Sequence, residues 1–244
     1  KAPPPAPQLE IAIIYEDDSI LAVDKPAGMA THGFSGRDGA TLANFLAAHR
    51  PEILHVGTSR WEPGLVHRLD IETSGVVLIA KTQAAFDALR EQFRRREVKK
   101  VYLALVWGVP LERGTIELVL AHDRGDSRHM VAERQPERST DRRIWRAVTH
   151  YRLVASARRM SLLEVVMETG VTHQIRVHLS SSGYPIVGDT LYGADHPESF
   201  GLARHFLHAR SLTLRHPATG QLLTVNAELA VELREVLQRI AMPI

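Results

Sequence analysis

Short apolar runs recur along this chain, and their spacing predicts both strands and helices. Runs rich in β-branched residues, bounded by glycine or charged residues, are typical of strands. The clearest is the run at residues 76–80, which reads as a buried strand. Strands are predicted at 11–15, 20–24, 76–80, 101–107, 115–120, 148–154 and 162–167, and a hairpin at 211–226 with its turn at 217–220.

Other segments have apolar residues at helical spacing. Thr41 and Thr82 each precede such a segment and can cap it, because a threonine oxygen accepts a hydrogen bond from a backbone N–H of the first turn. Pro51 is expected to end the first helix. Further helices are predicted at 173–182 and, closing the chain, at 229–240.

Strands and helices are intermixed, without the regular alternation that builds a parallel sheet. We therefore expect an α+β fold: one domain over 9–244, on a mostly antiparallel or mixed β-sheet flanked by helices and loops. Residues 1–8, KAPPPAPQ, hold too many prolines for a helix or central strand, and we expect a linker or tail there. Residues 122–146 are the least core-like, which indicates a functional or disordered segment.

Composition excludes several classes of protein. The chain has 244 residues, and a hydrophobic share of 44% is enough for a substantial core. No run approaches the roughly 18 apolar residues that a membrane span needs, and no signal segment opens the chain. The absence of cysteine excludes disulfides, cysteine-bound zinc and a thiol nucleophile, and is compatible with the cytoplasm. Net charge is only +2, but the arginines cluster, which favours a local basic surface.

The candidate chemistry begins in residues 64–82, GLVHRLDIETSGVVLIAKT, where HRLD stands directly before the buried strand. An aspartate before a Thr-Ser-Gly turn is most often a turn residue. Two further segments, KVYLA at 100–104 and THQIRVH at 172–178, also carry polar residues that a core does not require.

Arg176 is predicted on a partly buried helix face and then needs an acidic partner, because an unpaired buried charge costs several kcal/mol. Asp70 is the favoured partner. Exposure to solvent, or pairing with Asp189 or Glu168, are the alternatives.

Nucleotide and metal motifs are missing. The glycines of 25–39 match neither GxGxxG nor GxxxxGK[ST], and HExxH is absent. His173 and His178 are five residues apart, which splits them across a helix. We expect no metal.

Five segments together resemble the RluA family of RNA pseudouridine synthases: HRLDIETSGVVLIAKT, KKVYLALVWG, THQIRVHLSSSGYPIVGDTLYG, DKPAGMATHG and LHARSLTLRHPATG. The likeness extends from about Ile11 to the end, and HRLD followed by THQIRVH is highly specific. It implies that the 9–244 domain is a catalytic domain with an active-site cleft, and that it is an isomerase that converts uridine in structured RNA to pseudouridine. The reaction involves no net oxidation, hydrolysis or group transfer, so no cofactor is expected.

The resemblance also implies roles for single residues. Asp70 is the catalytic residue, Tyr102 packs on the target base, Arg176 pairs with Asp70, and Arg68 reaches into the RNA to support base flipping. Whether Asp70 acts as a nucleophile at C1′ or as a base at the sugar stays open. The family commonly has GRTHQIR, whereas Gly170 is followed here by Val171, which removes a cation near the site.

Further RNA contacts are expected from basic side chains, which bind phosphates without reading bases. One set lies beside the catalytic motif and after the second helix: His67, Arg94, Arg95, Arg96, Lys99 and Lys100. The other set lies in the 122–146 segment: Arg124, Arg128, Arg134, Arg138, Arg142, Arg143 and Arg146.

Two rival functions stay open: a catalytically silent RNA-binding module, and an RNA N-glycosidase with water as acceptor. Glycoside hydrolysis usually uses two carboxylates, and besides Asp70 only Glu72 and Glu168 are candidates.

Members of the resembled family modify ribosomal or transfer RNA, and those with ribosomal targets often carry an upstream S4-type RNA-binding domain. The proline-rich start lies where a linker to such an upstream domain would be, which favours ribosomal RNA. We expect a cytoplasmic monomer whose partner is RNA, with no membrane partner.

Overall fold

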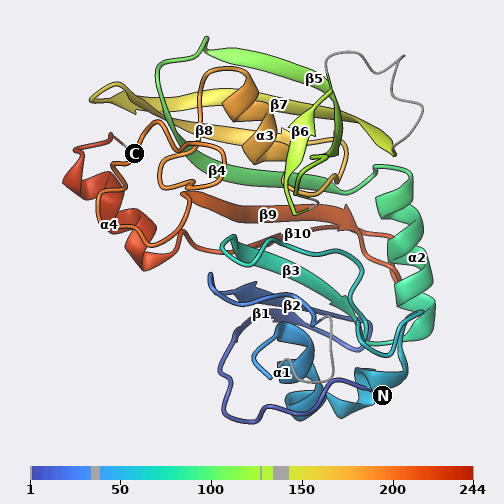
Figure 1. Ribbon diagram of the computed structural model, residues 1–244. Coiled ribbons are helices and arrows are strands. Elements are labelled where there is room, and N and C mark those ends of the chain that lie inside the picture. The colour runs from blue at the N-terminus through green and yellow to red at the C-terminus, as the bar shows by residue number, and fades with distance from the viewer. Residues whose placement is uncertain (1, 34–38, 127, 134–142, 244) are drawn as a thin grey trace. The chain divides into compact units, whose positions relative to one another are not determined.

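The computed structural model describes residues 2–33, 39–126, 128–133 and 143–243 (Figure 1). The chain forms two compact units, one made of Lys1–Lys99 with Ala209–Ala230 and the other of Lys100–His208 with Val231–Ile244. Both contain helices and strands, and every strand pair described below is antiparallel. The predicted α+β fold on mostly antiparallel strands is confirmed, whereas one catalytic domain over 9–244 stays a prediction.

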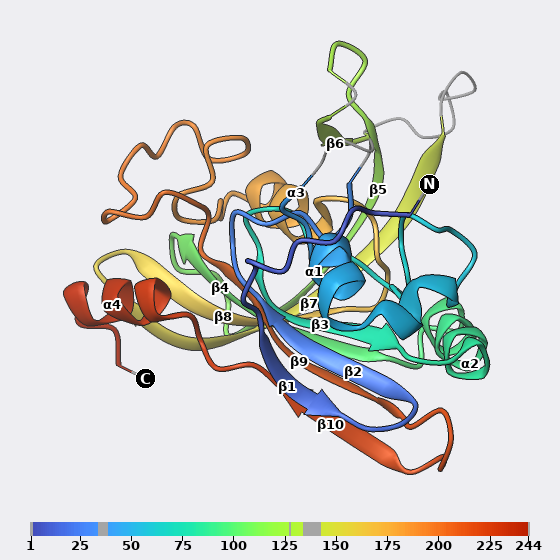
Figure 2. The same ribbon diagram turned by 90° about the horizontal axis from the view of Figure 1, so that it is seen from below.

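The first unit contains the strands β1, β2, β3 and most of β9, in this order, with β10 paired to β9. Their bounds are Ala12–Glu16, Ile20–Lys25, Ser74–Ala80, Leu207–Arg215 and Leu222–Asn226. Pairs β1–β2, β2–β3 and β9–β10 are antiparallel (Figure 2). All seven positions of β3 are buried. The predicted buried strand and the terminal hairpin are therefore confirmed.

Both threonine caps form as expected. Helix α1 (Leu42–His49) begins with a capping box in which Thr41 and Asn44 satisfy each other's backbone N–H groups, and a 3-10 helix (Pro51–His55) follows it. Helix α2 (Gln83–Arg94) begins at Thr82, whose side chain accepts a hydrogen bond from the Ala85 N–H. The capped apolar faces of both helices are buried.

Part of the proline-rich start packs on α1. The Ala6 N–H donates to the Asn44 carbonyl at 3.1 Å, and the Asn44 side-chain amide donates to the Pro4 carbonyl at 2.7 Å. Ala6 is only 3% exposed. This stretch of the expected linker or tail is therefore in contact with the first unit.

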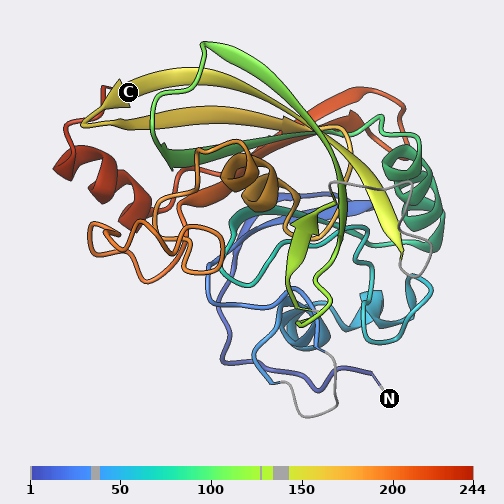
Figure 3. The same ribbon diagram turned by 45° about the horizontal axis from the view of Figure 1, so that its top comes forward.

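The second unit contains β4, β8, β7, β5 and β6, in this order. Their bounds are Lys99–Trp107, Met160–Met167, Ile144–Ala157, Arg113–His122 and Met130–Ala132. All neighbouring strands in this series are antiparallel. The helices are α3 (Gln174–Ser181), which lies against β5, β6 and β7 (Figure 3), and α4 (Val231–Arg239).

Residues 122–146, predicted to be the least core-like part of the chain, contain strand structure and one core residue among their described positions. Strand β6 pairs with β5, and β7 begins at Ile144. Met130 is 1% exposed and packs with Leu120, Ala147 and Val177. A three-residue strand with a single buried side chain has no readable period, so the sequence pattern could not reveal it. Arg134, Arg138 and Arg142 lie outside the described residues.

No helix among the described residues is long and apolar enough to cross a membrane.

One buried side chain of α3 makes the second unit sensitive to acid. His178 is 0% exposed, and within the described part of the chain neither ring nitrogen has a hydrogen-bond partner. Burial lowers the pKa of His178 to about 4, because the charged imidazolium would lose its hydration. The unfolded chain binds this proton at a pKa of about 6.5. The stability that a neutral His178 provides is therefore fully present above pH 6.5. It is lost progressively as the pH falls toward 4.

We expect His178→Leu to flatten this pH dependence. Lowering the pH from 7.5 to 5 should cost the parent protein about 2 kcal/mol more than the variant. Urea unfolding at both pH values measures the difference, with the exposed His55→Gln as control. A variant that keeps the full pH dependence of the parent would contradict this account.

Candidate active site

Asp70 lies in the turn that leads into β3. The Thr73 N–H donates to the Asp70 carbonyl at 3.1 Å and closes the turn, and the Asp70 side chain is half-buried. Thr73 and Ser74 are buried behind it. Gly75 has a φ of +116°, and a Cβ there would stand 2.2 Å from the Ala209 carbonyl oxygen of β9. Gly75 is therefore required by its backbone conformation and by close packing at the start of β3.

A buried lysine at the end of β2 holds this turn. Lys25 is 0% exposed, and its ammonium donates to the carbonyls of Pro26, Met29 and Ile71 at 2.8, 2.7 and 3.1 Å. The Gly28 N–H also donates to the Ile71 carbonyl, at 2.9 Å. These bonds tie the loop after β2 to the residue that follows Asp70.

Thr31 holds the residue on the other side of Asp70. Its hydroxyl donates to the Leu69 carbonyl at 3.0 Å and accepts from the Leu69 N–H at 3.2 Å. The backbone is thus fixed immediately before and after the aspartate. The sequence analysis did not single out Lys25 or Thr31, although a lysine at the end of a buried strand was an available signal.

His67 packs inside the first unit. Its Nε2 accepts the Leu78 N–H at 2.9 Å, and its ring stacks on Phe93 of α2 with centroids 5.1 Å apart. Nε2 of His67 is therefore already bonded to the backbone of β3. An RNA contact by His67 stays a prediction, and it would have to use another part of the ring.

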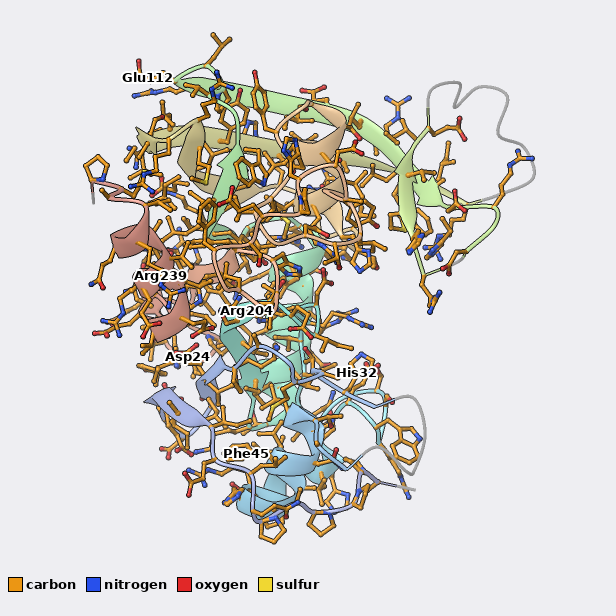
Figure 4. The ribbon with its side chains drawn as sticks, turned by 60° about the vertical axis from the view of Figure 1, so that its left-hand side comes forward. Asp24, His32, Phe45, Glu112, Arg204 and Arg239 are labelled. Carbon is orange, nitrogen blue, oxygen red and sulfur yellow. The ribbon has the colours of Figure 1, made fainter. Side chains whose placement is uncertain are left out.

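Arg68 is exposed and is hydrogen-bonded to His32, which Figure 4 labels. Its Nη1 donates to His32 Nε2 at 3.1 Å, and His32 Nδ1 lies 3.3 Å from the Gly33 carbonyl, to which it donates. His32 Nε2 also lies 3.5 Å from a carboxylate oxygen of Glu62. The arginine predicted to enter the RNA is thus on the surface and supported at its head group.

The basic side chains between the end of α2 and the start of β4 are exposed, except for Lys100. Arg94 and Arg95 both form ion pairs with Glu91 of the same helix, which offsets part of their charge, and Arg96 and Lys99 are exposed. Lys100 is 9% exposed, and its ammonium donates to the Thr169 carbonyl at 2.9 Å. Lys100 is therefore placed inside the second unit, apart from the exposed basic residues with which it was grouped.

In the second unit, Tyr102 and Arg176 are both buried. Tyr102 lies on β4 opposite Val165 of β8 and is 5% exposed, and Arg176 lies on α3. Gln174 anchors the start of α3: its Nε2 donates to the Val148 carbonyl at 2.9 Å, and its Oε1 accepts from the Thr169 hydroxyl at 2.7 Å. Within the HQIR motif, Gln174 therefore fixes the start of α3, whereas Arg176 places a buried charge on the same helix.

Arg176 is held by Asp189. Its Nε and Nη2 donate to the two carboxylate oxygens at 2.7 and 2.8 Å, a bidentate pair in which Asp189 is 3% exposed. Burial alone would raise the pKa of Asp189, but the hydrogen bonds and charge of Arg176 hold it below its ordinary value. Asp189 was one of the alternative partners in the sequence analysis. The predicted pairing of Arg176 with Asp70 would join the two units and stays a prediction.

Tyr192 completes this cluster. Its ring lies 4.9 Å from the Arg176 guanidinium carbon, and its N–H donates to the Asp189 carboxylate at 3.1 Å. Nearby, His205 is 4% exposed, and burial, with the charge of Arg176 as the second cause, lowers its pKa to about 3, so the ring is neutral. Tyr192 and Asp189 belong to the GDTLYG segment quoted for the resemblance, which was the available signal for both. Among the described residues, no group of three acidic or histidine side chains is arranged to hold a metal.

Comparison with known proteins gives one consistent result. The family described as RNA pseudouridylate synthase matches residues 19–181. A protein of Synechocystis sp. named uncharacterized RNA pseudouridine synthase is 36% identical over 233 residues, covering 95% of this chain and 69% of that protein. Ribosomal large subunit pseudouridine synthase D of Pseudomonas aeruginosa is 39% identical over 226 residues, covering 88% and 67%. The solved structure of human RNA pseudouridylate synthase domain containing 4 matches with a TM-score of 0.75 at 29% identity, covering 96% and 94%.

Proposed function

Because the chain belongs to the RNA pseudouridylate synthase family, and is thus an isomerase acting on RNA, we propose that it modifies ribosomal RNA and that Asp70 is its catalytic residue. The preference for ribosomal over transfer RNA is supported by three relatives named ribosomal large subunit pseudouridine synthase D, from Pseudomonas aeruginosa, Zymomonas mobilis and Nitrosomonas europaea, at 37–39% identity. A cytoplasmic location follows from this substrate and is part of the proposal.

The observation that carries the proposal for Asp70 is the fixed backbone on both sides of it. Lys25 binds the carbonyl of residue 71, and Thr31 binds both backbone groups of residue 69. A carboxylate that must attack or deprotonate a sugar needs such a position, because small displacements of a reacting group cost large factors in rate.

The reaction rearranges one nucleotide. The bond between N1 of uracil and C1′ breaks, the base turns within the pocket, and C5 bonds to C1′. The proton on C5 is released and N1 takes up a proton, so the product is an isomer of uridine. Asp70 serves either as nucleophile at C1′ or as base at the sugar, and both routes need it ionised. Atoms balance without an oxidant, a reductant or a water acceptor.

The remaining residues bind and hold the base. Tyr102 offers a flat face for the uracil, and stacking of a base on an aromatic ring contributes about 1–3 kcal/mol. Arg68, exposed and supported by His32, fills the gap left in the RNA when the uridine turns out of its stack. Arg176 is proposed to face the Asp70 carboxylate, the pairing that the resemblance implies, and its guanidinium would then favour the ionised form of Asp70.

A tritium-release assay tests this proposal. Ribosomal and transfer RNA transcripts labelled at C5 of uridine are incubated with the protein, and released tritium, free uracil and the carbon-linked nucleoside are measured. We expect tritium release from ribosomal RNA, with the isomer retained in the chain. Free uracil would identify an N-glycosidase, no reaction would identify a silent binding module, and isomerisation confined to transfer RNA would overturn the proposed substrate.

A further inference from the structure

We propose that Tyr192 is a positioning residue with two separable tasks: its ring orients the Arg176 guanidinium, and its hydroxyl fastens the β5–β6 hairpin to the start of α3. This inference rests on the proposed catalytic role of Arg176 and extends the site to a residue outside the HRLD, KVYLA and HQIR motifs. The contacts that carry the inference, with Arg176, Asp189, Met130 and His173, join residues of the second unit.

The ring restrains a motion that Asp189 leaves available. A bidentate carboxylate keeps the guanidinium in its own plane, but it does not by itself prevent the two groups from tilting together. The Tyr192 ring lies over the guanidinium with 4.9 Å between its centroid and Cζ, a cation–π contact that resists this tilt. Because the Tyr192 N–H also donates to Asp189 Oδ1, ring, carboxylate and guanidinium form one assembly.

The hydroxyl connects two distant segments. Its oxygen accepts the Met130 N–H at 2.9 Å and forms a hydrogen bond of 2.8 Å with His173 Nδ1. Met130 is the first residue of β6, and His173 is the residue immediately before α3, with a φ of 54° and no side-chain cap bond. One oxygen therefore links the end of the β5–β6 hairpin to the helix that carries Arg176.

The hairpin carries two arginines that are expected to contact phosphates, Arg124 and Arg128, between β5 and β6. Arg128 is 85% exposed and forms an ion pair with Asp126, which offsets part of its charge. A hairpin held in place before RNA arrives loses less conformational entropy on binding than a loose one. The Tyr192 hydroxyl is thus expected to influence RNA affinity, whereas the Tyr192 ring influences the chemical step through Arg176.

Two substitutions separate the tasks. Tyr192→Phe removes only the hydroxyl and should raise KM for RNA about three- to tenfold, with kcat unchanged, as the loss of hydrogen bonds of ordinary strength implies. Tyr192→Leu also removes the ring and should lower kcat about tenfold or more. Tyr184→Phe, a partly buried tyrosine of the same unit, is the matched control and should alter neither constant.

Hydrogen exchange and RNA affinity provide readouts that do not depend on catalysis. Exchange at the Met130 amide should accelerate in Tyr192→Phe and not in Tyr184→Phe, and Kd for RNA should rise in parallel. An unchanged Met130 amide, or equal effects of Tyr192→Phe and Tyr192→Leu on kcat, would overturn the inference. If the parent protein does not isomerise RNA, the proposed function and the ring's task fail, whereas the exchange and Kd measurements still decide the task of the hydroxyl.

Discussion

Asp70→Asn is expected to abolish isomerisation while leaving folding and RNA binding intact. Asparagine keeps the size of the side chain but supplies neither an anionic nucleophile nor a base, and loss of such a group lowers the rate by roughly 10²–10⁴-fold or more. The bonds from Lys25 and Thr31 that fix the turn go to backbone groups of residues 69 and 71, so the substitution does not remove them.

Single-turnover tritium release with ribosomal RNA measures the rate, and a binding titration and thermal unfolding measure the retained properties. Glu72→Gln is the matched control, because Glu72 is half-buried in the same turn and is the nearest rival carboxylate. Isomerisation by Asp70→Asn at the parent rate would remove Asp70 from the chemistry. Loss of activity in Glu72→Gln alone would transfer the role to Glu72.

Asp189→Ala is expected to destabilise the second unit by about 3–5 kcal/mol. The substitution deprives the buried Arg176 of its bidentate partner, and a buried charge whose partner is removed keeps its desolvation cost without the compensating attraction. It also deprives the N–H groups of Leu191 and Tyr192 of their acceptor. Denaturant unfolding, followed by a probe in the second unit, gives the change in free energy.

Two further variants show whether the cost comes from the ion pair. Adding Arg176→Met to Asp189→Ala should recover part of the lost stability, because the unpaired charge is then gone. Glu235→Ala removes the partner of Arg239 on α4, an exposed i,i+4 pair, and should cost less than about 0.5 kcal/mol. A double variant that is less stable than Asp189→Ala would contradict the account.

The elements that sequence reasoning located well are those with local causes. Thr41 and Thr82 cap the helices that follow them, because a capping side chain bonds to N–H groups only two or three residues away. Strand β3 is buried along its whole length, and its run from Val76 to Ala80 is apolar. The turn at 216–221 between β9 and β10 follows from Pro217 and Gly220.

The elements that were missed depend on contacts between distant residues. Strand β6 is too short to have a period, and Met130 becomes part of the core only when α3 brings Val177 against it. Lys100 looks like a member of a basic surface run, but β-strand alternation turns it inward, where it meets the Thr169 carbonyl. Charge in a sequence does not show on which side of a strand it will lie.

The sequence by itself determined the order of the elements, their caps, the position of Asp70 before a buried strand and, through its motifs, the family. Only the tertiary structure decided that Asp189 holds Arg176, that Lys25 and Thr31 hold the turn of Asp70, and that Tyr192 stands over the guanidinium. Local backbone preferences act over a few residues and leave a pattern in the chain. The partner of a buried charge is instead chosen by whichever loops the packed sheet brings within hydrogen-bonding distance, and that choice leaves no period in the sequence.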